Sequence, residues 1–432
     1  MPRDALKNNP RTPAWILAVT LALILPAFFS EDIIHILEGW VRLNFSTANL
    51  FTDYVFVTNN ATAFFNAGVM FLFSALLVYF SKIPFHGKQI AAMGMMIGFS
   101  FFGKNLFNSI PIVLGVYFYT RIFEPGWEEN VPTALFGTGI APLISELAFG
   151  FEGNRVLHIV IAYLVGIVIG ILLPIIARGV RAVHHGYCLY NIGFALGFIG
   201  MLVLSIMRMA GHNIYPENLL NHDQSLYVWI LLSGYFLLMI VIGLVVDHKA
   251  YLRLPALWLE TGIDPSDFIY QYGYGPTLIN MGMCGMIGLA YVYILGGTLN
   301  GPVIGGIFAI VGFAACGKHC GNIFPILLGV WIANAIHLSD AKSTGSLLAA
   351  LFGTTLAPIA GKYGFIAGVF VGFIHMAIVT QVGALHGGVV LYNNGFSGGI
   401  VAAVVVPILE EIEQYLPLQD KVFAKWRKHP EE

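Results

Sequence analysis

The stretch FGKNLFNSIPIVLGV, from Phe102 to Val116, places a lysine inside a run that is otherwise apolar and rich in glycine. The stretch CGKHCGNIFPILLGV, from Cys316 to Val330, repeats the same spacing of Gly-Lys, Asn, Pro and Leu-Gly-Val. A charged residue within a membrane segment is costly and usually lines a cavity or has a partner. The repetition predicts that this chain is built from two copies of one unit, each centred on a lysine.

The composition of the chain indicates a membrane protein. Its 432 residues are 57% hydrophobic and only 10% charged, with a mean hydropathy of +0.78, whereas soluble domains carry about 25% charged residues. Apolar stretches of about 20 residues recur from Trp15 onwards, and each could cross a hydrocarbon core of about 30 Å as a helix. The net charge is -2 and no basic stripe is present, so we expect no nucleic-acid partner. The lipid bilayer is the predicted environment of an all-α polytopic protein.

The duplication extends over most of the chain. Four blocks recur in one order: WIL at Trp15 and Trp229, NAG at Asn66 with NMG at Asn280, ALFGTGIAP at Ala134 with ALFGTTLAP at Ala350, and HGYCLYNIGF at His185 with HGGVVLYNNGF at His386. Self-similarity of this kind is the signature of a repeated structural unit.

Charge predicts the orientation, because basic residues near helix ends stay on the cytoplasmic side. Arg3, Lys7 and Arg11 place the N-terminus inside. Crossings are expected at about 13–29, 58–80, 89–120, 156–177 and 187–207 in the first copy, and at about 226–246, 275–297, 301–337, 363–382 and 388–409 in the second. The long run 89–120 is expected to be bent or broken.

A further segment in each copy is expected to turn back within the membrane. Residues 131–149 contain GTGIAP, and the second copy has GTTLAP; glycine and proline interrupt a regular helix, and re-entrant backbone is tolerated where protein covers it. Each copy then has five crossings, so the second copy is inverted relative to the first. Inverted repeats with broken helices are typical of transporters and channels, whose site lies near the membrane midplane.

The predicted organisation has five parts: a cytoplasmic segment 1–12, a first inverted repeat 13–208, an extracytoplasmic linker 209–225, a second inverted repeat 226–410 and a cytoplasmic tail 411–432. Localisation in a bacterial cytoplasmic membrane, with both termini cytoplasmic, follows as an expectation.

Two stretches carry a family resemblance: LYNIGFALG, from Leu189 to Gly197, and LYNNGFSGG, from Leu391 to Gly399. They are similar to a stretch of the urea transporter family, which the ten crossings in two inverted halves also resemble. This resemblance implies a path for a small amide-like solute and side-by-side protomers, each with its own pore. The duplicated pattern also resembles an uncharacterised family of bacterial membrane proteins, which implies no function.

The lysines are the first candidate site residues. On a helix, Lys104 would share one stripe with Asn108 and Pro111, as Lys318 would with Asn322 and its own proline. Lys104 falls near the middle of its run, where a charged side chain costs about 2.5–3.5 kcal/mol. We expect the two lysines to meet near a pseudo-twofold axis and bind a polar solute or anion. The alternative is a structural role, bonding the carbonyls of the broken helices.

The other candidates recur in the same way. The predicted substrate-binding residues, with both lysines, are Lys104, Asn108, Lys318, Asn322, Thr138, Thr354, Asn66, Asn280, Asn191 and Asn393. The threonines lie in the segments expected to be re-entrant, where backbone amides could bind solute, or where glycines only permit close packing. The remaining asparagines could equally form hydrogen bonds between helices.

The sequence contains no recognisable cofactor motif. CGKHC clusters Cys316, His319 and Cys320, but the first copy has Phe, Asn and Leu there, so we predict no metal site. An intramembrane enzyme acting on a lipid or amphiphile is the alternative function, yet catalysis needs distinct acid and base roles, whereas these polar residues are duplicated. We therefore predict a channel or transporter, not an enzyme, for a small-molecule solute that is either urea-like or a small anion. The urea transporter resemblance also implies a homo-oligomer.

Overall fold

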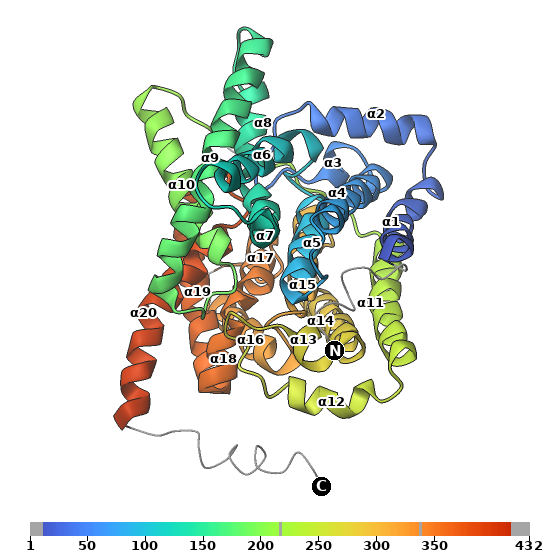
Figure 1. Ribbon diagram of the computed structural model, residues 1–432, viewed down its shortest axis with the longest axis vertical. Helices are drawn as coiled ribbons and strands as arrows, with labels where there is room; N and C mark the ends of the chain where they lie inside the picture. The colour runs from blue at the N-terminus through green and yellow to red at the C-terminus, as the bar shows by residue number, and fades with distance from the viewer. Residues whose placement is uncertain (1–11, 216–217, 337–338, 416–432) are drawn as a thin grey trace.

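The computed structural model describes residues 12–215, 218–336 and 339–415, which fold into helices joined by short connections (Figure 1). The first repeat contains α1 (Thr12–Phe28), α2 (Ile33–Asn44), α3 (Tyr54–Val57), α4 (Asn60–Phe80), α5 (Gly87–Phe99), α6 (Leu106–Ile122), α7 (Trp127–Gly137), the 3-10 turn η1 (Thr138–Ile140), α8 (Ala141–Phe149), α9 (Arg155–His184) and α10 (Asn191–Met209).

The second repeat follows in the same order. It contains α11 (Leu226–Val246), α12 (Ala250–Leu257), α13 (Phe268–Tyr272), α14 (Tyr274–Ile294), α15 (Gly301–Phe313), α16 (Cys320–Ala335), α17 (Thr344–Gly353), the 3-10 turn η2 (Thr354–Leu356), α18 (Ala357–Tyr363), α19 (Phe365–His386) and α20 (Asn393–Tyr415). The matched sequence blocks fall on equivalent elements, so α11 to α20 correspond to α1 to α10.

The helices confirm a polytopic membrane fold. In the described ranges, nine helices are long and apolar enough to cross a bilayer, and α1 joined to α2 through a 110° bend makes ten. Each repeat supplies five of these: α1 with α2, α4, α7 with α8, α9 and α10 in the first, and their counterparts in the second. The predicted all-α architecture of about ten spans is confirmed, and a bilayer is its environment.

The segment that reverses in each repeat is the one around the lysine. A short loop joins the end of α4 to the start of α5. The far end of α5 lies beside Asn66, near the start of α4, and the Asn66 side chain donates a hydrogen bond to the carbonyl of Lys104 at 3.0 Å. α6 then returns, because Trp127, which follows it, donates to Ser81 at the end of α4 at 2.8 Å. With only 13 and 17 residues, α5 and α6 form a broken, re-entrant hairpin.

The prediction that the segment 131–149 turns back within the membrane is wrong. α7 and α8 are continuous through one 3-10 turn, and the combined helix Trp127–Phe149 is a candidate span, as is Thr344–Tyr363 in the second repeat. The reason is the position of Pro142, which lies in the first turn of α8, where proline lacks only a hydrogen bond that a helix start would not make. GTGIAP therefore gives a local change of helix type, not a reversal.

The direction of this span follows from its neighbours along α6. Gly137 lies against Ile112, and further on Ser145 accepts a hydrogen bond from Asn108 at 3.0 Å, so α7 and α8 run past α6 in the opposite direction. The prediction that 89–120 crosses once is also wrong. The two segments have exchanged roles, which is why the predicted number of crossings still holds.

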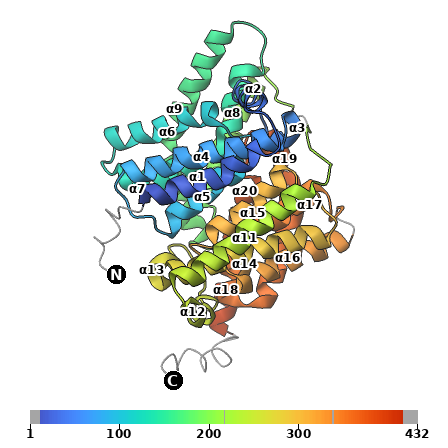
Figure 2. The same cartoon turned by 90° about the vertical axis from the view of Figure 1, so that its right-hand side faces the viewer.

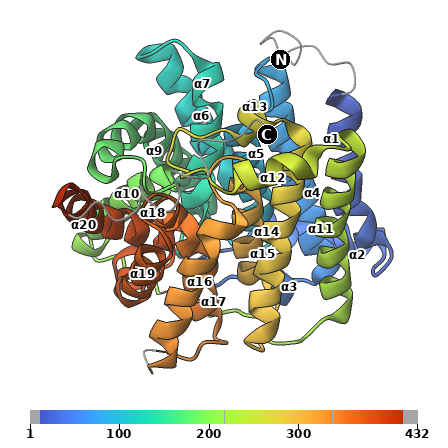
Figure 3. The same ribbon diagram turned by 90° about the horizontal axis from the view of Figure 1, so that it is seen from below.

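At the centre, α5 and α15 lie side by side in antiparallel orientation, between the two repeats (Figure 2). A Cβ atom at Gly94 would lie 2.7 Å from the Cα of Gly312, and Gly98 approaches Gly305 as closely. Small residues permit this approach of two backbones within a membrane. Around the pair, α11, α14 and α16 run alongside one another (Figure 3).

Each repeat also supports the helix start of the other. Asp53, at the start of α3, lies against Gly301, the first residue of α15. Its equivalent Asp267 accepts a hydrogen bond from the backbone N–H of Gly87, the first residue of α5, at 3.2 Å. Carboxylates favour helix N-termini because they accept from free N–H groups and complement the helix dipole. The two repeats are therefore joined by an exchange of caps.

Some predictions concern residues outside the described ranges. These are the N-terminal basic residues Arg3, Lys7 and Arg11, the rest of the segment 1–12 except its last residue, and the tail after residue 415.

Candidate functional site

The breaks that contain the lysines are held by asparagine side chains. Asn66 donates to the carbonyls of Ser100 and Lys104 at 2.8 and 3.0 Å, and its own oxygen accepts from the indole of Trp40 at 3.1 Å. Asn280 repeats the arrangement and donates to the carbonyl of Lys318 at 2.9 Å. These amides satisfy carbonyls that the interrupted helix leaves without partners. Asn66 and Asn280 thus form hydrogen bonds between helical segments, which is the structural role that the sequence left open for them.

The second pair of asparagines stabilises the same breaks from the other side. Asn108 accepts from the N–H of Asn105 at 2.9 Å and donates to the carbonyl of Gly103 at 3.0 Å. Asn322 makes the equivalent bonds, including one of 2.8 Å to the carbonyl of Gly317. Gly103 has a φ of +68°, which glycine adopts without strain. The break begins before Lys104, so this lysine does not share a helical stripe with Asn108.

The two lysines are completely buried but do not meet. Phe101 lies beside the start of α15, and the start of α5 lies beside Ala315, so Lys104 and Lys318 belong to opposite ends of a helix pair about 20 Å long. Lys318 Nζ donates to the hydroxyl of Tyr190 at 2.6 Å. The expectation that they meet at the pseudo-twofold axis is wrong, because α5 and α15 pack side by side instead of end to end.

Aromatic rings fill the region between the lysines. Tyr190 and Tyr392, which are equivalent residues, lie 5.8 Å apart between ring centroids. Tyr392 lies 4.8 Å from Phe99, and Tyr190 lies 4.8 Å from Phe313. Each of these phenylalanines also faces a lysine: Lys104 Nζ lies 4.8 Å from the centroid of Phe99, and Lys318 Nζ lies 5.4 Å from that of Phe313. Cation–π contacts of this kind partly compensate a buried ammonium group.

The predicted threonines lie next to this centre. The hydroxyls of Thr138 and Thr354 each donate to the carbonyl three residues earlier, at 2.6 Å. Thr138 Oγ1 also lies 3.3 Å from the sulfur of Met96, the residue that Lys104 contacts. Both threonines are buried in the 3-10 turns, and their donors are already used within the helix.

Asn191 and Asn393 bind buried histidines. Asn191 Oδ1 lies 2.9 Å from His184 Nε2, and Asn393 Oδ1 lies 2.5 Å from His386 Nδ1. The structure therefore brings Lys104, Asn66 and Asn108 together at one break and their equivalents at the other, while these two asparagines lie further along the chain beside the tyrosines.

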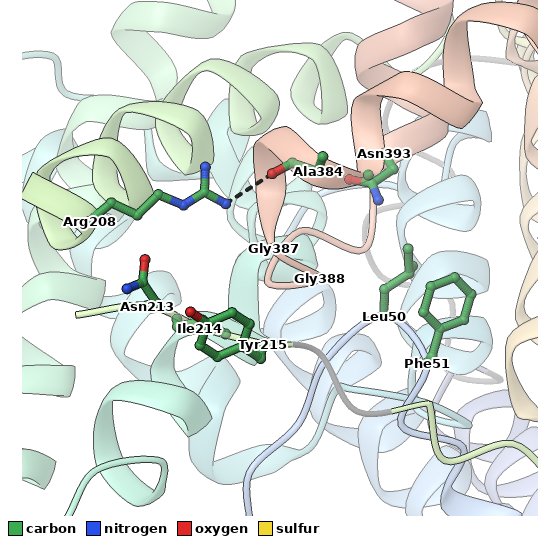
Figure 4. Close-up of a pocket in the computed structure, with 11 residues that line it drawn as sticks. Leu50, Phe51, Arg208, Asn213, Ile214, Tyr215, Ala384, Gly387, Gly388 and Asn393 are labelled. Carbon is green, nitrogen blue, oxygen red and sulfur yellow. Dashed lines mark hydrogen bonds between the residues drawn. The ribbon is translucent and has the colours of Figure 1, made fainter. Parts of the chain in front are cut away.

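Asn393 also lines a surface pocket of about 360 Å³ (Figure 4). Arg208, at the end of α10, points across it and donates to the carbonyl of Ala384 at 2.9 Å, while Leu50 forms part of the opposite wall. Of the predicted site residues, Asn393 is the one in the lining of this pocket. Arg208 was missed, and its only signal in the sequence is a basic residue in the last turn of an apolar segment.

Asp53 was also missed, although the pair Asp53 and Asp267 recurs at the same spacing as the lysines. Asp53 lies in the connection between α2 and α4, outside the spans. Burial raises the pKa of its carboxyl to about 6, and hydrogen bonds from the backbone N–H groups of Asn221 and Val55 oppose that rise. A charge in this position is costly because little water reaches it.

The fold and its lysine-containing breaks define a class: a multi-pass membrane protein made of two inverted, interlocked copies of one unit. The chain belongs to the family described as "Protein of unknown function (DUF1576)", whose model matches residues 33–209 and 247–411. This confirms the resemblance to an uncharacterised family of duplicated membrane proteins. No curated protein and no solved structure matches the chain significantly, and no likeness to urea transporters is shown.

Proposed function

We propose that this protein is a membrane channel or transporter that passes a small polar solute between its two repeats, and that the solute is a small anion. One observation carries the proposal: Lys104 and Lys318 are fully buried in two equivalent backbone breaks, and within the described ranges neither forms an ion pair. A buried ammonium group without a carboxylate is costly. An anionic solute would supply the missing partner.

The packing around the lysines favours a gated route over a permanently open pore. The rings of Phe99, Tyr190, Phe313 and Tyr392 close the space between the two lysines. A solute would pass only when these rings separate. In inverted-repeat transporters, one half moves against the other to expose a central site alternately to the two sides. The asparagine-held breaks would carry such a movement as rigid units.

The test is solute flux into liposomes that contain the purified protein. Lactate at about pH 8, where a carboxyl group is ionised, serves as the anion, and urea serves as the neutral solute suggested by the urea transporter resemblance. We expect lactate flux above that of protein-free liposomes, and at least a tenfold reduction when Lys104→Met and Lys318→Met are combined, since the variant has lost the buried positive charge that attracts the anion.

The matched control is Lys249→Met, which removes an exposed lysine at the start of α12 and should keep full flux. Thermal unfolding in detergent reports whether the double variant is folded. A folded double variant with unchanged lactate flux, or a wild-type protein that passes urea and excludes lactate, would refute the anion proposal.

A further inference from the structure

The two lysine centres are equivalent in sequence but differ in their contacts. Lys318 Nζ donates to the hydroxyl of Tyr190 at 2.6 Å. Among the described residues, the hydrogen-bond partner of Lys104 Nζ is the sulfur of Met96 at 3.6 Å, and a thioether is a weak acceptor. Tyr392, the equivalent of Tyr190, is 1% exposed, and its hydroxyl has no hydrogen-bond partner within the described residues. Buried tyrosine hydroxyls usually find a partner. In the described part of the chain, the first centre therefore lacks a hydrogen-bond partner for its tyrosine hydroxyl, whereas the second centre has one.

One difference between GTGIAP and GTTLAP accounts for this asymmetry. Thr355 accepts a hydrogen bond from the backbone N–H of Tyr190 at 2.9 Å, which fixes the position of this tyrosine. The equivalent residue is Gly139, and a Cβ atom there would lie 2.2 Å from the ring of Tyr392. The ring of Tyr392 therefore lies in space that a threonine would occupy, and its hydroxyl is not held against Lys104.

The unmet groups at the first centre define the chemistry of the missing partner. The ammonium of Lys104 and the hydroxyl of Tyr392 are both donors, and both side chains contact the ring of Phe99, with 4.8 Å to its centroid from Lys104 Nζ and from the centroid of Tyr392. Two buried donors and a positive charge need a ligand that accepts hydrogen bonds and carries negative charge. A carboxylate has two acceptor oxygens and suits both donors.

A route to this centre starts at the surface pocket. Gly388 and Asn393 line the pocket, and Tyr392 immediately precedes Asn393 in the chain. The neighbouring Leu391 reaches Gly103, next to Lys104: a Cβ atom at Gly103 would lie 2.8 Å from its side chain. The pocket is therefore separated from the lysine by the short segment that carries Leu391 and Tyr392.

The position that carries the positive charge of this pocket is acidic in the second repeat. Within the described ranges, Arg208 forms no ion pair, and its guanidinium donates to the carbonyl of Ala384. The equivalent of Arg208 in the second repeat is Glu410, which lies 3.8 Å from His185. We call the Arg208 pocket the first mouth and the equivalent surface region beside the second centre the second mouth. The first mouth is lined by Leu50, and the equivalent residue in the second mouth is Asp264.

The correspondence of the two mouths follows from their backbone contacts. The N–H of Leu50 donates to Gly388, and the N–H of Asp264 donates to Gly186 in the same way. Asp264 is paired with Arg181 at 2.9 Å. One mouth thus has a guanidinium without a carboxylate partner in the described ranges, whereas the carboxylates of the other lie beside Arg181 and His185, so an anion would be attracted more strongly to the first.

We propose that Lys104 and Tyr392 form the anion site of this protein, that it takes a small carboxylate entering through the Arg208 pocket, and that the Lys318–Tyr190 pair binds no ligand. The choice of an anion rests on the proposed function. The restriction to one of two equivalent centres rests on the contacts described above.

The experiment measures lactate binding to the full chain in detergent by isothermal titration calorimetry. We expect one site per chain. Tyr392→Phe removes a hydroxyl donor to a charged ligand and should weaken binding about tenfold to a hundredfold. Tyr190→Phe, the same change at the equivalent position, should alter the affinity less than about twofold. Thermal unfolding of both variants shows whether each is folded.

Two further measurements test the route and the ligand class. Arg208→Gln should weaken lactate binding at low salt, and the difference from wild type should shrink as salt screens the charge. Chloride, tested as a competitor, should displace lactate poorly, because a single spherical ion does not match two separate donors. Displacement as effective as that by lactate itself would contradict the carboxylate assignment.

Several outcomes would overturn the proposal: two sites per chain, equal weakening by Tyr190→Phe and Tyr392→Phe, or no binding to the wild-type protein. Failure of transport is distinguishable from failure of the site. Binding of one lactate with the expected difference between the tyrosine variants, but no flux in liposomes, would leave the site intact and refute the transport function.

Discussion

At the scale of single residues, recurrence identified the important positions but not their tasks. Asn66, Asn108 and their equivalents were found because polar residues recur at fixed spacing in apolar segments. A polar group in a membrane can be satisfied by protein or by solute, and the sequence does not distinguish these cases. The structure shows that the asparagines hold the breaks, while Lys104 is left with a weak partner.

The contacts of the tyrosines could not be predicted in this way. Tyr190 of the first repeat binds Lys318 of the second, a contact between residues 128 positions apart in the chain. Local periodicity carries no information about such a pairing. The difference between Gly139 and Thr355 was visible in the sequence, but its effect on Tyr392 depends on the packing of another repeat against it.

Asp53 leads to a prediction about pH. Its pKa in the folded protein is about 6, above the value of 3.8 for a free side chain, so folding favours the protonated form. Its contribution to stability is fully present below about pH 3.8 and is lost as the pH rises through about 6, by at most about 3 kcal/mol. Unfolding by heat in detergent, followed across this range, measures the effect.

Asp53→Asn should remove this part of the pH dependence, because an amide does not ionise, yet it can still accept hydrogen bonds at the helix start. Asp223→Asn, which changes an exposed carboxylate, should retain the wild-type slope. If Asp53→Asn retains the slope as well, Asp53 is not the group responsible.

At the scale of elements, length and composition misjudged which segment reverses. The run 89–120 was too long for one helix, and a bend seemed sufficient. The positive φ of Gly103, followed by the asparagine-capped start of α6, turns the chain back completely. In contrast, Pro142 looked like a helix breaker and proved compatible with a continuous span, because it lies in the first turn of α8. Proline and glycine signal an interruption, but their exact register decides its geometry.

The packing of α6 on α9 gives a second prediction. A Cβ atom at Gly115 would lie 2.2 Å from the carbonyl oxygen of Ile167 and 2.8 Å from the Cα of Gly170. Gly115→Ala should therefore destabilise the protein by about 1–3 kcal/mol, the usual cost of overpacking. Thermal unfolding in detergent checks this value.

Gly179, on α9, provides the matched control, since a Cβ atom there meets nothing within 4 Å. Gly179→Ala should leave stability unchanged or raise it slightly, because alanine is the better helix former. Equal losses in the two variants would show that close approach of backbones is not what Gly115 supplies.

At the scale of the whole molecule, the number of spans was predictable because the apolar runs and the charges at their ends indicate five crossings per repeat, and an odd number inverts the second copy. The assignment of individual segments was not, since exchanging a re-entrant hairpin with a crossing leaves that number unchanged. Only the neighbours of each segment, such as Trp127 beside Ser81, distinguish the two arrangements.

Labelling of single cysteines with a membrane-impermeant maleimide tests this topology. Lys82 is exposed just after the end of α4, and Glu129 is exposed in α7. Cysteines that replace these two residues should react from the same side of the membrane. A cysteine replacing Glu152, exposed beyond α8, should react from the opposite side, because the helix between them crosses. Reaction of Glu129→Cys and Glu152→Cys from one side would restore the re-entrant interpretation of 131–149.

The exchange of caps between Asp53 and Asp267 has a consequence for biosynthesis. When the first repeat leaves the ribosome, the start of α5 lacks the carboxylate of Asp267, and the turn around Gly139 lacks the segment that carries Tyr392. The first repeat therefore inserts into the bilayer as an incomplete body, and its last contacts form only after the second repeat has been synthesised. Completion of the fold is an event of the whole chain, although its two parts arose as copies of one unit.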